Sequence, residues 1–416
     1  MTRSEANDTD ASGVAGLPAR AAALRLLDAV LRQGQRLDAT LPSATRGIEL
    51  AEDRALALAI ASEALRRLPD LDALIDSATA QPLAHDLKAR SVLRIALVQA
   101  LVLGTPPHAA IATALPLVSG GPRRLVHGVF GTVMRRGAAL PDPPRLPDKV
   151  VARWRRWGYA MLSDAARALA HAPPLDVTLR NPGDDGGLGG ESLAPGHRRL
   201  ARGTAVTALP GYDEGKWWVQ NLAASVPARL LGPGGGRSVL DLCAAPGGKT
   251  MQLAAQGWAV TAIDNHSGRL GRLRENLART GLAAAVIEAD ILAWEPPAPV
   301  DAILLDAPCT STGVFARHPD VLYRIEAADI AKLAALQARL LARAMTWLRP
   351  GGTLIYATCS LEAEEGEDII AASGFARDPV LEAELPAEFR PDPIGQVRIL
   401  PSPGLDGFFV ARLKAA

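Results

Sequence analysis

The sequence feature that most restricts the fold of this chain is the stretch from Ser238 to Thr250, which reads SVLDLCAAPGGKT. Its first five residues predict a short buried strand. The Pro-Gly-Gly turn that follows predicts a tight bend, because Gly247 and Gly248 lack a β-carbon. A helix is then expected to begin near Lys249 and to direct its free N–H groups at a ligand over the turn. A strand, a glycine turn and a helix in this order form the first unit of a Rossmann-like nucleotide site.

Two related glycine motifs do not fit this stretch. A phosphate-binding P-loop requires a glycine five residues before Gly248, where the chain has Cys243. The dinucleotide pattern G-x-G-x-x-G is absent as well. For these residues alone, an ordinary strand-to-helix turn without a ligand remains an alternative, because glycine turns are common in α/β domains. The residues downstream count against that alternative.

The chain downstream alternates strands and helices, which is typical of a parallel α/β sheet. The expected strands cover residues 260–264, 284–288, 302–305, 353–357, 397–400 and 407–413, with helices over 270–280 and 327–348. Ligands of such sheets bind at the carboxyl ends of the strands. The residues that we expect there are Asp264, Asp290, Asp306, Cys309 and Cys359. An acid about 20 positions past the glycine turn, as Asp264 is, commonly accepts hydrogen bonds from a ribose diol.

These residues favour a particular chemistry. A turn without a phosphate clamp, followed by two acids, favours an adenosine ligand without phosphates, and S-adenosylmethionine is the obvious one. A cysteine is a strong soft nucleophile as a thiolate, which forms near neutral pH once the surroundings lower the pKa of the thiol from about 8.5. Carbon 5 of a pyrimidine cannot attack a methyl sulfonium unaided, but thiolate addition at carbon 6 gives an enamine that can. Asp306 is placed to bind the ring edge and share a proton with N3. The alternative is that Cys309 and Cys359 are small buried hydrophobic residues.

The front of the chain has a helical pattern from about residue 17 to residue 137, with breakers at 104–107 and 120–122. We expect an all-α bundle with arginines at helix ends, either as solvated caps or as phosphate-binding groups. These arginines are Arg66, Arg67, Arg123, Arg124, Arg135 and Arg136. Residues 15–205 contain 25 Lys and Arg against 17 Asp and Glu, whereas the chain from residue 206 is net acidic. This distribution suits a polyanion-binding module joined to a catalytic one, although a solvated Arg-rich surface has the same composition.

The region between these parts predicts a linker and a small module. Residues 138–149 are rich in proline and are expected to form the linker. A helix over 151–169 carries Trp154 and Trp157 among arginines, and its aromatic residues are expected to pack inward, with stacking on bases as the alternative. Expected strands at 177–181 and 207–209, and a Gly/Asp-rich loop at 183–190, complete a small α+β module over residues 150–220.

Length and composition restrict the class of protein. A chain of 416 residues is expected to form two or three domains. No apolar run reaches the roughly 18–20 residues of a membrane span, and the polar start, residues 1–16, is expected to be a disordered tail instead of a signal peptide. The three cysteines form no C-x-x-C pair, which suggests neither zinc nor a redox dithiol and fits a reducing compartment. We therefore expect a cytoplasmic monomer without a metal.

Several motifs together resemble the RNA cytosine-5 methyltransferases of the Nop/Sun family. In chain order they are residues 241–250 (DLCAAPGGKT), 306–314 (DAPCTSTGV), 317–320 (RHPD), 356–361 (YATCSL) with 365–367 (EGE), and 406–409 (DGFF). The front half, with residues 92–99 (VLRIALVQ) and 107–110 (PHAA), is similar to the NusB-like domain of bacterial members that modify small-subunit ribosomal RNA. The resemblance implies a NusB-like RNA-binding domain over 17–140 and a Rossmann-like class I methyltransferase domain over 221–416.

The resemblance also implies a role for each residue of the site. Cys359 would be the nucleophile, Cys309 the thiol that helps release the product, and Asp306 the contact to the cytosine, with Lys249 near the point of methyl transfer. The residues implied to hold S-adenosylmethionine are Cys243, Ala244, Ala245, Pro246, Gly247, Gly248, Lys249, Asp264, Asp290 and Asp306. The implied substrate is RNA, and specifically ribosomal RNA of the small subunit.

The chain departs from the family pattern at four places. Asn221 replaces a usual Asp, Gly366 a usual Asn, Leu405 a usual Thr, and His127-Gly128 a usual Asn-Ala. The first two lie around the expected site and bear on its rate, and the last bears on how the NusB-like domain contacts RNA.

Two other functions remain open at this point. One is a DNA cytosine-C5 methyltransferase-like enzyme that uses Cys309 as the nucleophile, because the DNA enzymes use a Pro-Cys thiol like that of Pro308-Cys309. The other is a non-catalytic RNA-binding ribosome-assembly factor with a vestigial cofactor pocket.

Overall fold

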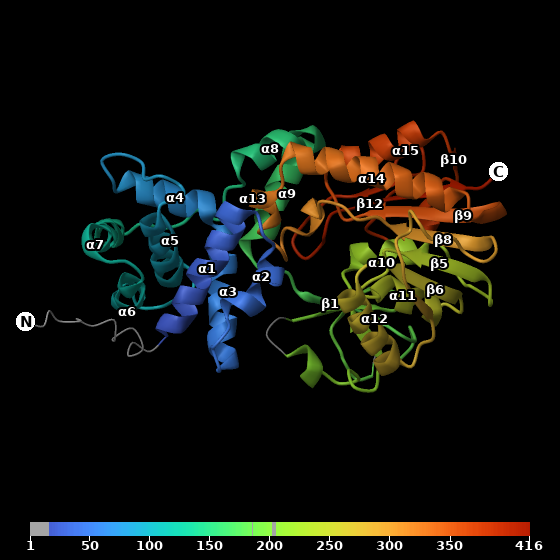
Figure 1. Ribbon diagram of the computed structural model, residues 1–416, viewed down its shortest axis with the longest axis horizontal. Coiled ribbons are helices and arrows are strands. Elements are labelled where there is room, and N and C mark those ends of the chain that lie inside the picture. Colours follow the sequence, from blue (N-terminus) through green and yellow to red (C-terminus); the bar gives the residue numbers. More distant parts are fainter. Residues whose placement is uncertain (1–15, 185, 202–204) are drawn as a thin grey trace, which may run out of the picture. The chain divides into compact units, whose positions relative to one another are not determined.

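The computed structural model describes residues 16–184, 186–201 and 205–416, and it divides into two compact units (Figure 1). Of the described residues, those up to Ala152 and His318–Ile325 form unit 1, and those of the ranges Arg153–Arg317 and Glu326–Ala416 form unit 2. The tail predicted for residues 1–16 lies outside the described residues except for Gly16. Within the described ranges, no helix has the length and hydrophobicity needed to span a bilayer.

Unit 1 is helical, as the pattern of the front half predicts (Figure 1). Its helices from the front of the chain are α1 (Leu17–Gln33), α2 (Leu37–Ala44), α3 (Ala51–Arg66), α4 (Leu68–Ser77), α5 (Lys88–Leu101), α6 (Pro107–Ala114) and α7 (Gly120–Arg135). Every residue of α5 from Ala89 to Gln99 is buried, so this helix is the centre of the bundle. Its buried Arg94 pairs with Asp72, at 2.8 Å between Nε and Oδ1.

A short segment from the back half of the chain also belongs to unit 1. It contains helix α13 (Val321–Arg324), and the Tyr323 hydroxyl donates a hydrogen bond of 2.7 Å to the carbonyl of Leu65 at the end of α3. The Lys149 ammonium donates to the Tyr323 carbonyl at 3.0 Å. Most of the sequence motif at 317–320 therefore lies in the helical unit, and only Arg317 stays in unit 2.

Unit 2 is built on an eight-stranded mixed sheet with the strand order β10-β12-β9-β8-β5-β6-β7, and β11 pairs with β12. The strands are β5 (Ser238–Leu242), β6 (Ala259–Asp264), β7 (Ala285–Glu288), β8 (Val300–Asp306), β9 (Leu348–Thr358), β10 (Ala376–Arg377), β11 (Val397–Ile399) and β12 (Phe408–Lys414). Strands β5 to β9 pair in parallel, and β12 runs antiparallel to β9. The predicted Rossmann-like α/β fold is confirmed.

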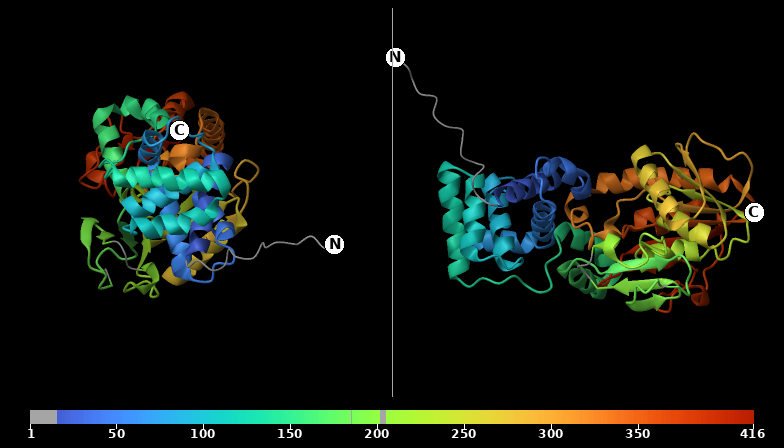
Figure 2. Two further views of the ribbon diagram at one scale, coloured as in Figure 1. Left: turned by 90° about the vertical axis from the view of Figure 1, so that its left-hand side faces the viewer. Right: turned by 90° about the horizontal axis from the view of Figure 1, so that it is seen from below.

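Helices cover both faces of this sheet (Figures 1 and 2). Helices α10 (Leu222–Arg229) and α11 (Gly248–Ala255) pack on one face, together with α12 (Ser267–Thr280) over its β6 side. Helices α14 (Ala327–Met345) and α15 (Glu367–Ser373) pack on the other. Successive side chains of a strand point to opposite faces, so Val239 of β5 joins the first core and Leu240 the second. Burial on both faces explains why these strands are almost wholly apolar.

A smaller, four-stranded antiparallel sheet precedes the large one in the described part of unit 2. Its strands are β1 (Leu175–Leu179), β2 (Glu191–Ala194), β3 (His197–Leu200) and β4 (Trp217–Val219), in the order β2-β3-β1-β4. The strand expected at 207–209 is wrong, because Val206–Ala208 forms a 3-10 turn. The prediction of a single helix over 151–169 is also wrong. The region forms two helices, α8 (Asp148–Trp154) and α9 (Gly158–Ala170), because Gly158 takes a positive φ of 88°.

The inward packing expected for Trp154 is confirmed. Its side chain is fully buried, its ring centroid lies 5.3 Å from that of Phe315, and its indole N–H donates to Glu362 Oε1 at 3.1 Å. A base could not stack on this ring without unfolding the surroundings, so the alternative prediction, that Trp154 stacks on bases, is wrong.

Truncation of this side chain is expected to destabilise unit 2. Trp154→Ala leaves a large cavity and removes the indole hydrogen bond to Glu362 Oε1, which keeps its ion pair with Arg153 at 3.4 Å. The substitution should lower the free energy of unfolding by about 3–5 kcal/mol. Urea unfolding followed by circular dichroism measures the change. The matched control is Tyr159→Ala, at a residue that is 91% exposed, where a change within about 0.5 kcal/mol is expected. Equal unfolding midpoints for the two variants would contradict the assignment of Trp154 to the core.

Candidate active site

The loop between β5 and α11 forms the tight turn that the sequence predicts. Cys243 adopts a left-handed φ of 61°, and Gly247, the N-cap of α11, adopts a φ of 103°. A β-carbon on Gly247 would lie 3.0 Å from Leu273 Cγ, so a glycine is needed there both for its φ and for its size. The first N–H groups of α11 are therefore free to face a ligand at the carboxyl edge of the sheet.

Asp264, the last residue of β6, holds this loop in place. Its buried carboxylate accepts hydrogen bonds from the backbone N–H of Ala245 at 3.2 Å and of His266 at 3.0 Å, and pairs with Arg269 Nη2 at 2.9 Å. The Arg269 side chain is half exposed, so it can move aside for a ligand. Asp290 lies just beyond the neighbouring strand β7, where its carboxylate accepts from the Leu292 N–H at 2.9 Å.

Lys249 and Asp306 form an ion pair at the same edge of the sheet, with 2.7 Å between Nζ and Oδ2. Burial on its own would lower the pKa of Lys249, but the charge of Asp306 and its hydrogen bond outweigh burial and raise that pKa. The Lys249 ammonium also lies 5.1 Å from the centre of the Phe408 ring. Lys249 is therefore a fixed cation beside the carboxylate of Asp306.

Cys309 and Cys359 lie side by side, with 3.5 Å between their sulfurs. Cys309 follows β8 and Cys359 follows β9, and because these strands pair in parallel their carboxyl ends meet. Both thiols are half-buried. The hydrogen bond from Cys309 lowers the pKa of Cys359, against the effect of burial. The same hydrogen bond, together with burial, raises the pKa of Cys309. A single proton between the two sulfurs thus leaves Cys359 as the more acidic thiol.

The structure brings Lys249, Asp306, Cys309 and Cys359 together, since Asp306 and Lys249 both act electrostatically on the Cys359 thiol. Cys243 stands apart from this group in its chemistry. Burial and the nearby carboxylates of Asp264 and Asp306 raise its pKa, so it stays a neutral thiol. Asp264 and Asp290 lie at the ends of β6 and β7, on the far side of β5 from β8 and β9.

The structure shows what surrounds three of the four departures from the family pattern. The Asn221 side chain caps α10 by accepting from the Ala223 N–H at 3.2 Å, and donates to Asp176 Oδ2 at 3.0 Å. A β-carbon on Gly366 would lie 2.9 Å from Arg398 Nη2 and 2.9 Å from Phe409 Cγ, so an asparagine there would require these side chains to move. His127 and Gly128 lie on the exposed side of α7.

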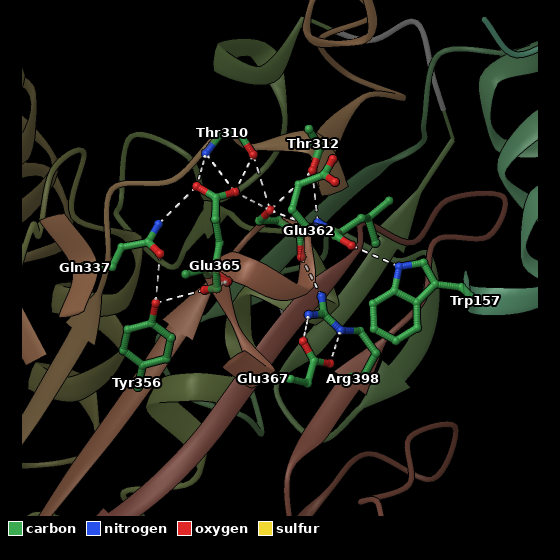
Figure 3. Close-up of polar contacts among 12 residues, drawn as sticks. Trp157, Thr310, Thr312, Gln337, Tyr356, Glu362, Glu365, Glu367 and Arg398 are labelled. Carbon is green, nitrogen blue, oxygen red and sulfur yellow. Dashed lines mark hydrogen bonds and ion pairs between the residues drawn. The ribbon is translucent and has the colours of Figure 1, made fainter. Parts of the chain in front are cut away.

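Glu365, for which the motifs predict no role, lies at the centre of a buried polar network (Figure 3). Nearby, Arg398 pairs with both carboxylate oxygens of Glu367 at 2.9 and 2.6 Å, and Trp157 donates to the Leu361 carbonyl at 2.9 Å. The signals in the sequence are that acidic residues follow Cys359 closely and that Glu365 begins the motif at 365–367 (EGE).

Solved structures share this fold. The crystal structure of PH0851 has a TM-score of 0.70 and 23% sequence identity, and the alignment covers 96% of this chain and 99% of that one. A methyltransferase homologue from Pyrococcus horikoshii has a TM-score of 0.54 and 26% identity, covering 69% of this chain and 98% of its own.

Two family models match the chain, "16S rRNA methyltransferase RsmB/F" over residues 228–414 and "NusB family" over residues 17–135. The protein named ribosomal RNA small subunit methyltransferase B from Xylella fastidiosa (strain Temecula1) is 36% identical over 425 residues, covering 96% of this chain and 98% of that protein. Its namesake from Klebsiella pneumoniae (strain 342) is 36% identical over 432 residues, covering 95% and 97%. These matches confirm both the resemblance and the predicted cofactor, S-adenosylmethionine. The chain therefore belongs to the RsmB/F family of methyltransferases and carries a NusB-family domain in front of the catalytic part.

Proposed function

We propose that this chain is an S-adenosylmethionine-dependent RNA cytosine-C5 methyltransferase that acts on small-subunit ribosomal RNA through a covalent adduct between Cys359 and the base. The observation that carries the proposal is the pair of sulfurs 3.5 Å apart, beside the ion pair of Lys249 and Asp306. The names of the relatives support the choice of RNA. In this proposal the helical unit over 17–140 and the module over 150–220 contact the phosphate backbone, and residues 221–416 carry the chemistry.

The residues at the carboxyl ends of β5, β6 and β7 fit the cofactor. A buried carboxylate such as Asp264 suits a ribose diol, and the turn over 243–247 with the N-terminus of α11 offers backbone N–H groups. Asp290 is exposed and sits one strand further along the same edge. S-adenosylmethionine supplies an electrophilic methyl group when it is bound.

The first step that we assign to the protein is attack by the Cys359 thiolate on carbon 6 of the cytosine. The lowered pKa of Cys359 raises the fraction of thiolate near neutral pH. A carbon–sulfur bond forms at carbon 6, the electron pair of the C5=C6 bond shifts to form a C4=C5 bond, and the electron pair of the C4=N3 bond moves to N3. N3 takes a proton from the Asp306–Lys249 pair, in which the ammonium lies 2.7 Å from the carboxylate. Carbon 5 then becomes the nucleophile that is alkylated.

The second step assigned to the protein is removal of the carbon-5 proton, which re-forms the C5=C6 bond and expels the Cys359 sulfur. The largest cause of the raised pKa of Cys309 is its hydrogen bond to Cys359. Once Cys359 is a thioether, its negative charge is gone and the pKa of Cys309 falls. Cys309 can then lose its own proton to water and, as a thiolate, accept the proton of carbon 5. Cys359 leaves as a thiolate, and N3 returns its proton to the Asp306–Lys249 pair.

Of the two alternatives, attack by Cys309 is disfavoured because the pKa of that thiol is raised. A non-catalytic assembly factor would have no need of an acidified thiol beside a second sulfur and an ion pair. Bisulfite sequencing of ribosomal RNA from a deletion strain and from the wild type tests the proposal, and loss of one modified cytosine is expected. Incubation of the purified protein with labelled cofactor and either ribosomal RNA or duplex DNA separates the RNA and DNA functions.

Cofactor binding in this proposal depends on the charge of Asp264. Asp264→Asn keeps the shape of the side chain but removes the charge that a ribose diol would bond. A hydrogen bond to a charged group contributes about 1.5–3 kcal/mol, so the Kd for S-adenosylhomocysteine should rise about 10- to 100-fold in calorimetry. The matched control is Asp301→Asn. Asp301 lies near the start of β8 and accepts a hydrogen bond from the Ser238 N–H, at the amino ends of the strands and so away from the proposed cofactor site. Equal Kd values for both variants would remove Asp264 from the cofactor site.

A further inference from the structure

Glu365 bonds residues of both loops that carry the sulfurs, and Figure 3 shows its contacts to Thr310 and Gln337. Its fully buried carboxylate accepts hydrogen bonds from the Thr310 backbone N–H at 2.9 Å, from the Thr310 hydroxyl and from the Ser360 hydroxyl. Thr310 directly follows Cys309, and Ser360 directly follows Cys359. A single carboxylate therefore ties together the residues next to the two thiols, which are 50 positions apart in the chain.

A second set of contacts makes this connection rigid. Gln337 on α14 donates to Glu365 Oε1 at 3.1 Å and to the Pro308 carbonyl at 2.9 Å, so the Cys309 loop is held on both sides of the cysteine. The Tyr356 hydroxyl, on the strand that leads to Cys359, contacts the Glu365 carbonyl at 2.9 Å and Gln337 Oε1 at 3.2 Å. The network thus fixes the direction of both loops as well as the distance between them.

The charge of Glu365 matters as well as its shape. The groups that reach the carboxylate are neutral donors, and an ionised carboxylate is an acceptor for all of them at once. Burial raises the pKa of Glu365, while the hydrogen bonds from Ser360, Thr310 and Gln337 stabilise its ionised form. After the hydrogen bond to Cys359 and burial, the charges of Cys359 and Glu365 further raise the pKa of Cys309. Glu365 thereby adds to the difference between the two thiols.

We propose that Glu365 is the positioning residue of this site, which holds Cys309 and Cys359 at the separation at which both sulfurs reach one pyrimidine. The inference rests on the proposed function, in which one sulfur bonds carbon 6 and the other serves the adjacent carbon 5. Because these atoms are neighbours in the ring, the sulfurs must stay close together throughout the reaction. Reacting atoms have to approach to about 3–3.5 Å, and a displacement of about 1 Å can cost about 100-fold in rate.

Thiol reactivity without RNA tests the positioning directly. In the wild type, iodoacetamide should label Cys359 faster than Cys309, as measured by mass spectrometry of the two peptides over a range of pH. In Glu365→Gln the amide nitrogen cannot accept a hydrogen bond, so at least one donor of the network is lost and the charge disappears. The pKa of Cys309 should then fall, because the charge of Glu365 is gone, and the pKa of Cys359 should rise, because its hydrogen bond from Cys309 is weakened. The ratio of the Cys359 labelling rate to the Cys309 labelling rate should drop about tenfold for each pKa unit by which the difference between the two thiols narrows.

The matched control is Glu362→Gln. Glu362 is also buried and lies three positions before Glu365, but its carboxylate accepts from Trp154 at 3.1 Å instead of from the residues next to the thiols. This variant should keep the wild-type labelling ratio even where it lowers the melting temperature. Should Glu365→Gln fail to fold, Ser360→Ala removes one donor and keeps the carboxylate, and a smaller fall in the ratio is expected.

Turnover gives the second measurement. With ribosomal RNA as substrate, Glu365→Gln should lower kcat about 100-fold and leave the RNA KM and the cofactor Kd unchanged, whereas Glu362→Gln should stay close to the wild type. A wild-type labelling ratio in folded Glu365→Gln, or in Ser360→Ala where only that variant folds, would overturn the inference. If the ratio collapses in Glu365→Gln but the wild-type protein methylates no cytosine, the positioning role stands and the proposed function fails.

Discussion

Replacement of Cys359 by alanine is expected to abolish methylation, with a fall of at least about 10⁴-fold in single-turnover rate, because loss of a covalent nucleophile commonly costs that much or more. Carbon 5 of cytosine has too little electron density to be alkylated unless a thiolate first adds at carbon 6. Cys309 is not expected to replace it, because its sulfur serves carbon 5 in this proposal, and burial and the charge of Glu365 still raise its pKa when Cys359 is gone. Transfer of a labelled methyl group to ribosomal RNA, with enzyme in excess, measures the effect.

Two controls keep this result interpretable. The Cys359→Ala protein should bind S-adenosylhomocysteine with the wild-type Kd in calorimetry, because none of the residues that we assign to the cofactor follows β9, the strand that leads to Cys359. It should also unfold at nearly the wild-type urea concentration, because alanine leaves only a small gap at a half-buried position. Methylation within tenfold of the wild type would rule out Cys359 as the nucleophile.

Replacement of Cys309 by alanine is expected to trap the covalent protein–RNA adduct, which Cys359→Ala cannot form. Cys359 can still attack, and carbon 5 can still be alkylated, but the sulfur 3.5 Å away that would assist release is missing. The protein–RNA adduct should therefore accumulate as a slower band under denaturing conditions, and turnover should fall about 100- to 10,000-fold, the range typical of a general acid or base.

The double variant Cys309→Ala/Cys359→Ala is the matched control, because it should form no adduct at all. Chase of the isolated Cys309→Ala adduct with excess unlabelled RNA measures how slowly the covalent bond breaks. If the adduct instead accumulates in Cys359→Ala and is absent in Cys309→Ala, the two roles are reversed and the enzyme attacks with its Pro-Cys thiol.

The sequence predicts the catalytic fold well because the buried parallel strands are short apolar runs between clear turns. The strand expected over 238–242 is β5 without any change of bounds, and the helix expected near Lys249 begins at Gly248. The same reasoning locates the acids and the two cysteines, because the carboxyl ends of parallel strands meet at one edge of the sheet. The distance between the sulfurs depends on packing, and no pattern in the chain gives it.

The weaker predictions fall where local pattern and tertiary packing disagree. Strands β2 and β3 follow a Gly/Asp-rich loop, and the run His197–Leu200 has two arginines at its centre, so neither strand has a clear alternating pattern. The break between α8 and α9 depends on the φ of a single glycine, Gly158. Glu365 bonds Thr310, which is 55 positions before it in the chain, and Gln337, which is 28 positions before it. No pattern in a single sequence indicates contacts between residues so far apart.

The placement of His318–Ile325 in unit 1 has a consequence for synthesis on the ribosome. Domains generally fold as they emerge, with the N-terminal one first. The helical unit is completed later than that order implies, because the hydroxyl that bonds the Leu65 carbonyl belongs to Tyr323 and leaves the exit tunnel only after most of the chain has been translated. This contact can form only once a peptide made more than two hundred and fifty codons later has emerged.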